Sequence, residues 1–392
     1  MLVADHNDSA GGFSAIQGEG LGWPDAIPMT VATGLGWPTD SRETSVSRET
    51  STEPAEAADR EPPAAHDRID VDDEARRLEV AGAIPDADDS TPLAQEIAAN
   101  ARRRIDLAGR RFPAPPHTRV ITIANQKGGV GKTTTTVNVA AALAQRGLTV
   151  LVLDNDPQGN ASTALGIDHH ADVLGLYDVL VDSRPLADVI QECPDVPNLL
   201  CAPATIDLAG AEIELVSMVA RETRLRSALD AYLRQRDHDG LPRIDYVLVD
   251  CPPSLGLLTV NAFVVAKEVF IPIQCEYYAL EGLSQLLKNI ELIRAHLNPD
   301  LHVSTILLTM YDGRTRLAAQ VAEEVRTHFP DVVLRTSVPR SVRISEAPSH
   351  GQTVITYDPG SSGALSYLSA ARELAERGAA QVVVNDSVKE QQ

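Results

Sequence analysis

The sequence predicts an α/β protein with a doubly wound, mainly parallel sheet and a long disordered N-terminal tail. Three observations support this prediction. Apolar runs typical of buried strands alternate with helix-like segments after residue 117. A glycine-rich loop joins the first such run to the first helix, and two further runs end in aspartate. Folds of this kind bind ligands where the carboxyl ends of the strands meet.

The first 91 residues do not have the composition of a folded domain. Residues 1–100 hold 21 acidic and 6 basic side chains, a net charge of −15, with abundant Pro, Ser, Thr, Ala and Gly. Too little apolar surface is available there to offset the chain entropy lost on folding. We therefore expect residues 1–91 to form a disordered acidic tail. A Gly-Leu-Gly-Trp-Pro repeat at 20–24 and 34–38 contains both tryptophans, which suits either contact with a polar scaffold protein or simple duplication.

A helix and a basic linker are expected between the tail and the sheet. Residues 92–105 contain good helix formers, with apolar residues near i, i+4 spacing. Residues 102–111 carry five arginines against one acid. These arginines suit a solvated helix end or an auxiliary phosphate contact, and the sequence leaves both open. We assign residues 92–116 to this helix and linker.

Residues 117–380 contain the alternating strands and helices of the folded domain. The expected strands are 120–124, 148–153, 244–250, 268–273, 302–309 and 331–335. The expected helices are 135–146, 278–297, 316–329 and 363–377. Unbroken apolar strands are typical of a parallel sheet covered by helices on both faces. Residues 381–392 are expected to be a frayed C-terminus.

The loop after the first strand has the pattern of a phosphate-binding loop. It lies between an apolar strand and a helix start, the context that this motif requires. Its glycines let the backbone curl, so that N–H groups and the positive end of the helix face an anion. Lys132 is expected to reach the β- and γ-phosphates, and the Thr133 hydroxyl to bind Mg²⁺. The residues assigned to nucleotide binding are Lys127, Gly128, Gly129, Val130, Gly131, Lys132, Thr133 and Thr134.

The loop departs from the ordinary P-loop at its start. The pattern G-x-x-x-x-G-K-[ST] requires glycine where this chain has Gln126, and a second lysine, Lys127, follows. The loop thereby resembles the deviant Walker A box of the ParA/MinD/nitrogenase-iron-protein superfamily of P-loop NTPases. This resemblance implies that Lys127 reaches across a sandwich dimer to the partner's ATP. It therefore implies a homodimer as well as a nucleotide.

Two strands end in aspartates that extend this resemblance. The run 148–153 precedes Asp154-Asn-Asp-Pro-Gln-Gly-Asn160, and the run 244–249 precedes Asp250-Cys-Pro-Pro-Ser254. By resemblance, Asp156 orients or activates the attacking water, Asp154 supports the Mg²⁺ shell, and Asp250 holds Mg²⁺ through water. Mg²⁺ needs only one or two carboxylates besides water and phosphate oxygens. The catalytic residues implied are Lys127, Lys132 and Asp156, and the metal-holding residues are Thr133, Asp154 and Asp250.

The stretch 307–359 resembles one branch of the superfamily, the chromosomal ParA/Soj proteins. Leu308-Thr-Met-Tyr-Asp-Gly-Arg-Thr-Arg-Leu317 and Val338-Pro-Arg-Ser-Val-Arg-Ile-Ser-Glu-Ala-Pro-Ser-His-Gly351 support this resemblance, which covers roughly residues 117–378. In that family, an arginine after the Met-x-Asp turn and another in the Pro-Arg-x-Val-Arg segment contact DNA non-specifically. They correspond to Arg314 and Arg343. Arg340 is a weaker candidate, which could instead serve the nucleotide or the dimer.

The function implied by the resemblance is that of an ATPase for chromosome segregation. ATP and Mg²⁺ would close a dimer that binds double-stranded nucleoid DNA non-specifically, and a centromere-binding ParB protein would stimulate ATP hydrolysis and release. From residue 117 onward the net charge is −10, so contact with DNA must come from a local basic patch. The expected location is the cytoplasm, in association with the nucleoid.

Three rival classes of protein fit the sequence less well. A membrane-cycling ATPase needs a C-terminal amphipathic helix with basic and bulky apolar faces, whereas residues 382–392 offer one lysine and no aromatic. A scaffold with a purely structural nucleotide would not need Thr133, Asp156 and Asp250. A plasmid-type ParA carries an N-terminal winged-helix domain that the acidic tail cannot form. The four cysteines lack C-x-x-C spacing, and no apolar segment of 18 residues occurs, so zinc, disulfides and a membrane are not expected.

Overall fold

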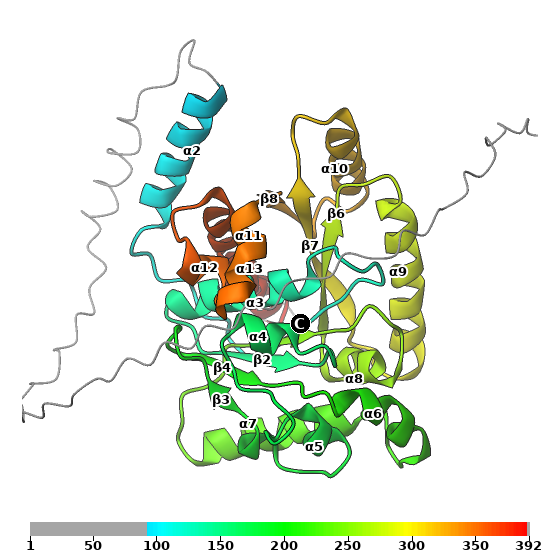
Figure 1. Ribbon diagram of the computed structural model, residues 1–392. Helices are drawn as coiled ribbons and strands as arrows, with labels where there is room; N and C mark the ends of the chain where they lie inside the picture. The colour runs from blue at the N-terminus through cyan, green and yellow to red at the C-terminus, as the bar shows by residue number, and fades with distance from the viewer. Residues whose placement is uncertain (1–91, 390–392) are drawn as a thin grey trace, which may run out of the picture. The chain divides into compact units, whose positions relative to one another are not determined.

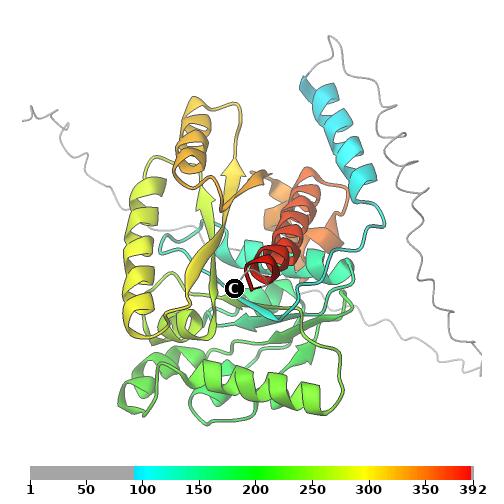
Figure 2. The same cartoon turned by 180° about the vertical axis from the view of Figure 1, so that it is seen from behind.

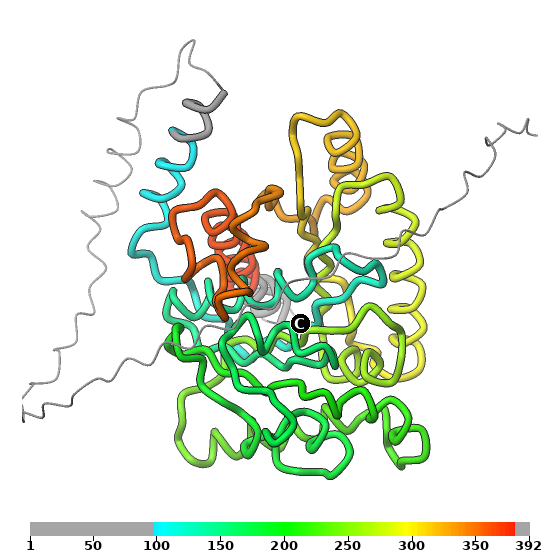
Figure 3. The backbone as a smooth tube through the Cα atoms, in the orientation of Figure 1, coloured from blue at the N-terminus to red at the C-terminus, as the bar shows by residue number. Residues whose placement is uncertain are grey.

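The computed structural model describes residues 92–389 (Figures 1 and 3). All of these residues belong to a single compact structural unit, Arg68–Gln392. The acidic tail expected over residues 1–91, with its tryptophan repeat and its scaffold contact, lies outside the described residues and stays a prediction. Residues 390–392 lie outside them as well.

Eight strands of the described chain form one sheet, in the order β3-β4-β2-β5-β1-β6-β7-β8. Their bounds are β1 Arg119–Ile123, β2 Val150–Asp154, β3 Gln191–Glu192, β4 Leu199–Ala202, β5 Tyr246–Asp250, β6 Glu268–Gln274, β7 His302–Tyr311 and β8 Val333–Pro339. All neighbouring strands are parallel except β3 and β4, which pair antiparallel at one edge. The strand β1 lies inside the sheet, with β5, β2, β4 and β3 on one side of it and β6, β7 and β8 on the other. The predicted doubly wound, mainly parallel fold is therefore confirmed.

Helices cover both faces of this sheet (Figures 1 and 2). Their bounds are α2 Pro92–Leu107, α3 Lys132–Gln145, α4 Asn160–Ala164, α5 Leu176–Leu180, α6 Leu208–Glu214, α7 Arg224–His238, α8 Leu257–Val265, α9 Ala279–His296, α10 Arg316–His328, α11 Val342–Glu346, α12 Val354–Tyr357 and α13 Ser362–Lys389, with short 3-10 turns η1 Leu186–Asp188, η2 Leu215–Ser217 and η3 Ala347–His350. Successive side chains of a strand point to opposite faces. Val150 and Val152 therefore pack with α3 and α13, whereas Leu151 and Leu153 pack with α5, α6, α7 and α8.

The C-terminal end corrects one expectation. The sequence predicts a last helix that ends at residue 377 and a frayed segment over 381–392, but α13 continues to Lys389. No proline occurs between residues 378 and 389, so nothing there forces the helix to stop. None of the helices within residues 92–389 is both long and apolar enough to cross a lipid bilayer.

The helix predicted before the domain is present as α2, and it is packed on α13. Leu107 and Phe112, at and just after its end, are buried in the same cluster as α3 and α13. Arg372 of α13 forms an ion pair with Asp106 at 2.5 Å. These contacts give the C-terminal part of α2 a defined place on the domain.

Candidate functional site

The predicted phosphate loop lies between β1 and α3, at the carboxyl end of the sheet. Gly129 and Gly131 have φ angles of 73° and 90°, in the left-handed region that favours glycine. The N–H of Thr135 bonds to the Gly131 carbonyl at 2.8 Å, so the N–H groups of residues 132–134 have no partner within the helix. The Thr309 hydroxyl donates to the Val130 carbonyl at 2.8 Å and fixes the loop against β7. This geometry suits an anion at the helix start.

Lys132 lies beneath the loop and close to the predicted acids. Its side chain is buried, and its Nζ donates to the carbonyl oxygen of Lys127 at 3.4 Å. Burial lowers the pKa of Lys132, and the negative charges of Asp250 and Asp156 act in the opposite direction. The structure therefore brings this lysine and the predicted acids into one electrostatic centre.

Asp154 and Asp250 lie side by side at the ends of β2 and β5. The two residues are register partners in the sheet, and both are fully buried. Burial raises the pKa of Asp154 to about 6. Burial, followed by the charge of Asp154, raises the pKa of Asp250 to about 7. Two adjacent buried carboxyl groups repel each other when both are ionised, so this pair is suited to a cation.

Each of these acids has one oxygen held by the chain and one without a partner. The Ser162 N–H and hydroxyl both donate to Asp154 Oδ2 at 2.7 Å, and the Thr136 hydroxyl donates to Asp250 Oδ1 at 2.9 Å. Asp154 Oδ1 and Asp250 Oδ2 are buried and have no hydrogen-bond partner within residues 92–389. Buried acceptors of this kind are normally completed by a water or an ion. Ser162 and Thr136 were missed by the sequence analysis, which had no signal for hydrogen bonds to the acids.

The donor set fits Mg²⁺. The two unpartnered oxygens belong to hard ligands, and the Thr133 side chain lies close enough to Asp250 to lower the pKa of that carboxyl. In the described part of the chain no group of three or more His, Cys, Asp or Glu side chains could hold a metal by itself. Mg²⁺ usually takes one or two carboxylates and completes its shell with water and phosphate oxygens. The site therefore suits a metal that arrives with a phosphate ligand.

Asp156 lies in the turn that leads from β2 to α4. Its Oδ1 accepts the Gln158 N–H at 3.0 Å, and its side chain is mostly buried. Its charge raises the pKa of both Asp154 and Asp250, so it faces the same centre. The structure thus brings together the predicted central residues Lys132, Thr133, Asp154, Asp156 and Asp250.

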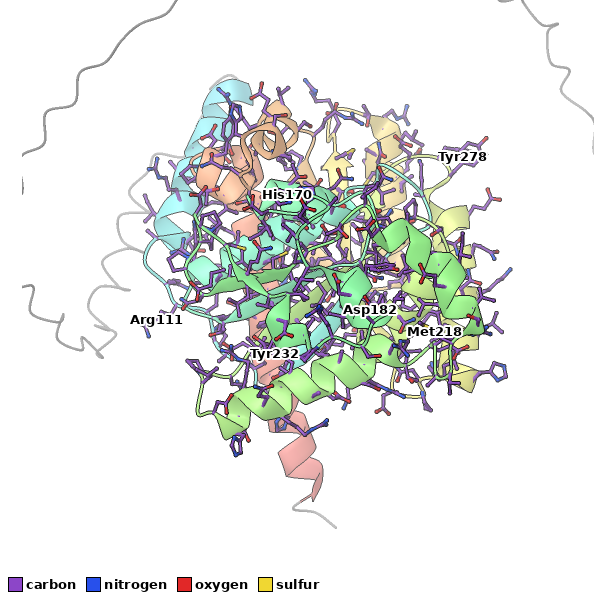
Figure 4. All side chains as sticks on the ribbon, turned by 60° about the horizontal axis from the view of Figure 1, so that its bottom comes forward. Arg111, His170, Asp182, Met218, Tyr232 and Tyr278 are labelled. Atoms are coloured by element: carbon purple, nitrogen blue, oxygen red, sulfur yellow. The ribbon has the colours of Figure 1, made fainter. Side chains whose placement is uncertain are left out.

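Lys127 does not belong to this buried centre. Its side chain is 39% exposed and forms an ion pair with Glu276, which follows β6, at 2.5 Å. The Gln274 amide also donates to Glu276. The next two residues, Tyr277 and Tyr278, are exposed and pack edge to face with ring centroids 5.1 Å apart, and Tyr278 lies at the outer edge of the molecule in Figure 4. Glu276 was not predicted from the sequence, because it lies 149 positions from Lys127 along the chain.

The arginines predicted to contact DNA lie outside the centre and are paired with acids of the same chain. Arg314 is 91% exposed, and its guanidinium donates to the two carboxylate oxygens of Asp312 at 2.9 and 3.0 Å. Arg343 in α11 forms ion pairs with Glu346 at 3.1 Å and with Asp358 at 3.4 Å. Neither set of counter-ions was anticipated from the sequence.

Arg340 lies near both Asp312 and the phosphate loop. It is exposed, and its charge, after that of Arg314, lowers the pKa of Asp312. It also lines a cavity of about 270 Å³ together with Gly131, Thr134 and Tyr367. The position of Arg340 is therefore compatible with both roles considered for it, at DNA and at the nucleotide.

Comparisons with known proteins agree with this geometry. Residues 118–303, which include the loop and the three aspartates, match a family model described as an AAA domain. The sporulation initiation inhibitor protein Soj of Bacillus subtilis is 54% identical over 260 residues, which cover 66% of this chain and 99% of Soj. The chromosome partitioning protein ParA of Caulobacter vibrioides is 50% identical over 259 residues, which cover 66% of this chain and 94% of that protein. A solved structure of cobyrinic acid a,c-diamide synthase from Mycobacterium smegmatis, with bound ADP and magnesium, is 36% identical with a TM-score of 0.54, and the match covers 66% of this chain and 93% of that one.

Proposed function

Because this chain belongs to the ParA/Soj family of chromosome-partitioning ATPases, we propose that it is an ATP-driven switch that binds nucleoid DNA as a dimer. It is an ATPase that uses Mg²⁺. The observation that supports this function best is the pair of buried acids, Asp154 and Asp250. Each presents an unpartnered carboxylate oxygen beside the phosphate loop.

The residues of the centre have different roles in ATP hydrolysis. When Mg²⁺ is bound together with ATP, it neutralises part of the negative charge of the phosphates. Lys132 and the N–H groups of residues 128–134 would hold the phosphates, while Asp154, Asp250 and the Thr133 hydroxyl would hold the metal. Asp156 orients the attacking water and accepts its proton. Ser162 and Thr136 fix the two metal-holding acids through the hydrogen bonds described above.

The base of the nucleotide has a place next to the loop. The cavity of about 270 Å³ that Arg340 lines also includes Gly131 and Thr134, which belong to the loop and the start of α3, and Met310 and Pro339 at the ends of β7 and β8. We assign the base to this cavity, because it is contiguous with the phosphate site and is lined by both apolar and polar residues. Arg340 would then sense the nucleotide and lie close to DNA at once.

Lys127 couples the nucleotide to dimerisation. In the structure it is held by Glu276 of its own chain, and on dimerisation it would exchange this carboxylate for the phosphates of the partner's ATP. Gly128 faces open space, since a Cβ added there would have no atom within 4 Å. That side of the loop is therefore free to meet a second subunit. Dimerisation in this form depends on the γ-phosphate and is lost on hydrolysis.

The dimer is the form that binds DNA. Arg314 and Arg343 are exposed cations, and two copies on one body raise the effective affinity by multivalency. Contacts to the phosphate backbone are independent of sequence and depend steeply on salt. Without a partner protein the attacking water is poorly held, so turnover is slow until a ParB-type protein stimulates it. The switch would thus act on the nucleoid in the cytoplasm.

Co-sedimentation with double-stranded DNA tests this function. The protein is incubated with DNA of unrelated sequences and Mg²⁺, in the presence of ATP, of ADP, or of no nucleotide. We expect binding only with ATP, equal for all sequences and lost at high salt. Binding that is the same in all three nucleotide states would overturn the proposed switch.

A further inference from the structure

We propose that the basic helix α2 extends the DNA-binding surface of the domain, so that the chain contacts more phosphates than Arg314 and Arg343 alone would reach. This inference rests on the DNA binding proposed above. It concerns residues before the domain, for which the sequence left both a solvated helix end and a phosphate contact open.

The first observation is the charge of α2 and the residues after it. Residues 92–112, which comprise α2 and the residues after it, contain five arginines against two acids, Glu96 and Asp106. Asp106 is already shared by two cations, since Arg372 lies 2.5 Å and Arg110 3.5 Å from its carboxylate oxygens. Arg103 and Arg104 are exposed. This positive segment stands out in a chain with a net charge of −21, and such local clusters are typical of nucleic-acid contacts.

The second observation is where this charge lies. A Cβ added to Gly360 would lie 3.8 Å from Arg104 Nη1. Gly360 is two residues beyond Asp358, which pairs with Arg343 at 3.4 Å. Arg104 and Arg343 therefore flank the same turn, between α12 and α13. Figures 1 and 2 show α2 alongside this part of the domain.

The third observation is that the end of α2 is anchored. Leu107 and Phe112 are buried in the main cluster, and the pair between Arg372 and Asp106 ties the helix to α13. Arg103 and Arg104 precede this anchored end within α2, and Figure 4 shows Arg111, which follows the helix in the chain, at the outer edge of the molecule. An arginine on an anchored helix loses less conformational entropy on binding than one on a free chain, so its contact with a phosphate contributes more to affinity. The arrangement favours a rigid, extended polyanion that spans α2 and α11, as double-stranded DNA would.

The test compares charge variants of the full-length protein with ATP and Mg²⁺. Binding to a fluorescent double-stranded DNA is measured by anisotropy at salt concentrations from about 50 to about 200 mM. We expect Arg103→Ala with Arg104→Ala to weaken binding about tenfold and to lower the salt slope by about 2 per subunit, since each phosphate contact contributes about 0.9. Replacing both with lysine should retain most of the binding. ATP-dependent dimerisation and the ATPase rate without DNA should not change.

The matched control removes two exposed charges elsewhere, through Arg234→Ala in α7 with Lys267→Ala before β6. We expect this variant to bind DNA like the wild type. A wild-type affinity and salt slope for the α2 variant would overturn the inference, as would an equal loss in the control, because overall charge would then be responsible. If the wild-type protein itself does not bind DNA with ATP, both the proposed function and this inference are wrong. That result differs from a wild-type affinity of the α2 variant, which would contradict the inference alone.

Discussion

The nucleotide centre and the cations around it are built in opposite ways. Asp154 and Asp250 are fully buried and are fixed by hydrogen bonds from their own chain. Lys127, Arg314 and Arg343 have side chains that are 39%, 91% and 56% exposed, and each is held by an acid of the same chain. Exposed ion pairs contribute only about 0–1 kcal/mol. The centre is therefore preorganised for chemistry, whereas the outer cations can exchange an internal carboxylate for an external phosphate at little cost.

Removal of the central lysine should produce the largest effect. Lys132→Ala is expected to weaken ATP binding by at least about 100-fold, because a buried cation near the phosphates contributes more than an exposed one. Fluorescent ATP binding with Mg²⁺ measures this. Lys127→Ala is the matched control, since it removes the exposed lysine of the same loop and should leave ATP binding of the monomer within about threefold. Equal losses in the two variants would remove the distinction between the centre and its surroundings.

The second prediction separates binding from chemistry within the centre. Asp156→Ala should bind ATP and form the dimer, but its turnover should fall about 100-fold or more, because the variant lacks the carboxylate proposed to orient the attacking water and to accept its proton. The protein should then stay on DNA. Phosphate release and DNA retention measure these effects. Normal ATP hydrolysis by this variant would show that Asp156 does not act on the water.

The third prediction tests the outward side of the loop. Gly128→Val adds a branched side chain that does not clash with its own subunit, since no atom lies within 4 Å of a Cβ added at this position. The φ angle at this position is not in the left-handed region, so valine adds no backbone strain of that kind. ATP binding should persist while the ATP-dependent dimer is lost, as measured by light scattering. A normal dimer would mean that the second subunit does not approach this side of the loop.

The sequence predicted most of the centre because its residues follow local patterns. Each acid comes at the end of an unbroken apolar strand, and parallel strands end at the same edge of the sheet. Elements without such patterns were missed. The strand β4 has only four residues, and α7 has three buried side chains, Leu225, Leu229 and Tyr232, among many charged ones.

The surroundings of the centre could not be predicted in the same way. Glu276 meets Lys127 only because β6 lies next to β1 in the folded sheet. Asp358 meets Arg343 through the turn after α12. Contacts of this kind depend on tertiary geometry and on exposed side chains with several rotamers, for which the sequence gives no spacing rule. The position of α2 beside α13 is another example.

The fourth prediction concerns pH and the metal. The pKa values of Asp154 and Asp250 are raised above those of ordinary carboxyl groups, so in the absence of metal the folded state binds more protons than the unfolded state. The stability they contribute is complete below about pH 4 and is lost as the pH rises through about 7. Mg²⁺ needs the ionised acids, so the increase in melting temperature on adding Mg²⁺ and a non-hydrolysable ATP analogue should be greater at about pH 8 than at about pH 5.5. Asp250→Asn should reduce this difference, and an equal increase at both pH values would contradict the assignment.

The smallest expected effect comes from the counter-ions of the arginines that we propose contact DNA. Asp312→Asn keeps an oxygen for the Arg314 N–H, which donates to Asp312 Oδ1 at 3.1 Å, but removes the charge that competes with DNA phosphates for Arg314. We expect DNA affinity with ATP to rise about two- to fivefold, with no change in dimerisation. Asp237→Asn, at an exposed acid of α7, is the charge-matched control and should change affinity less. Weaker binding by Asp312→Asn would instead mean that Asp312 positions Arg314 for DNA. That arginine would then be preorganised like the buried centre, and the contrast between the two regions would hold only for Lys127 and Arg343.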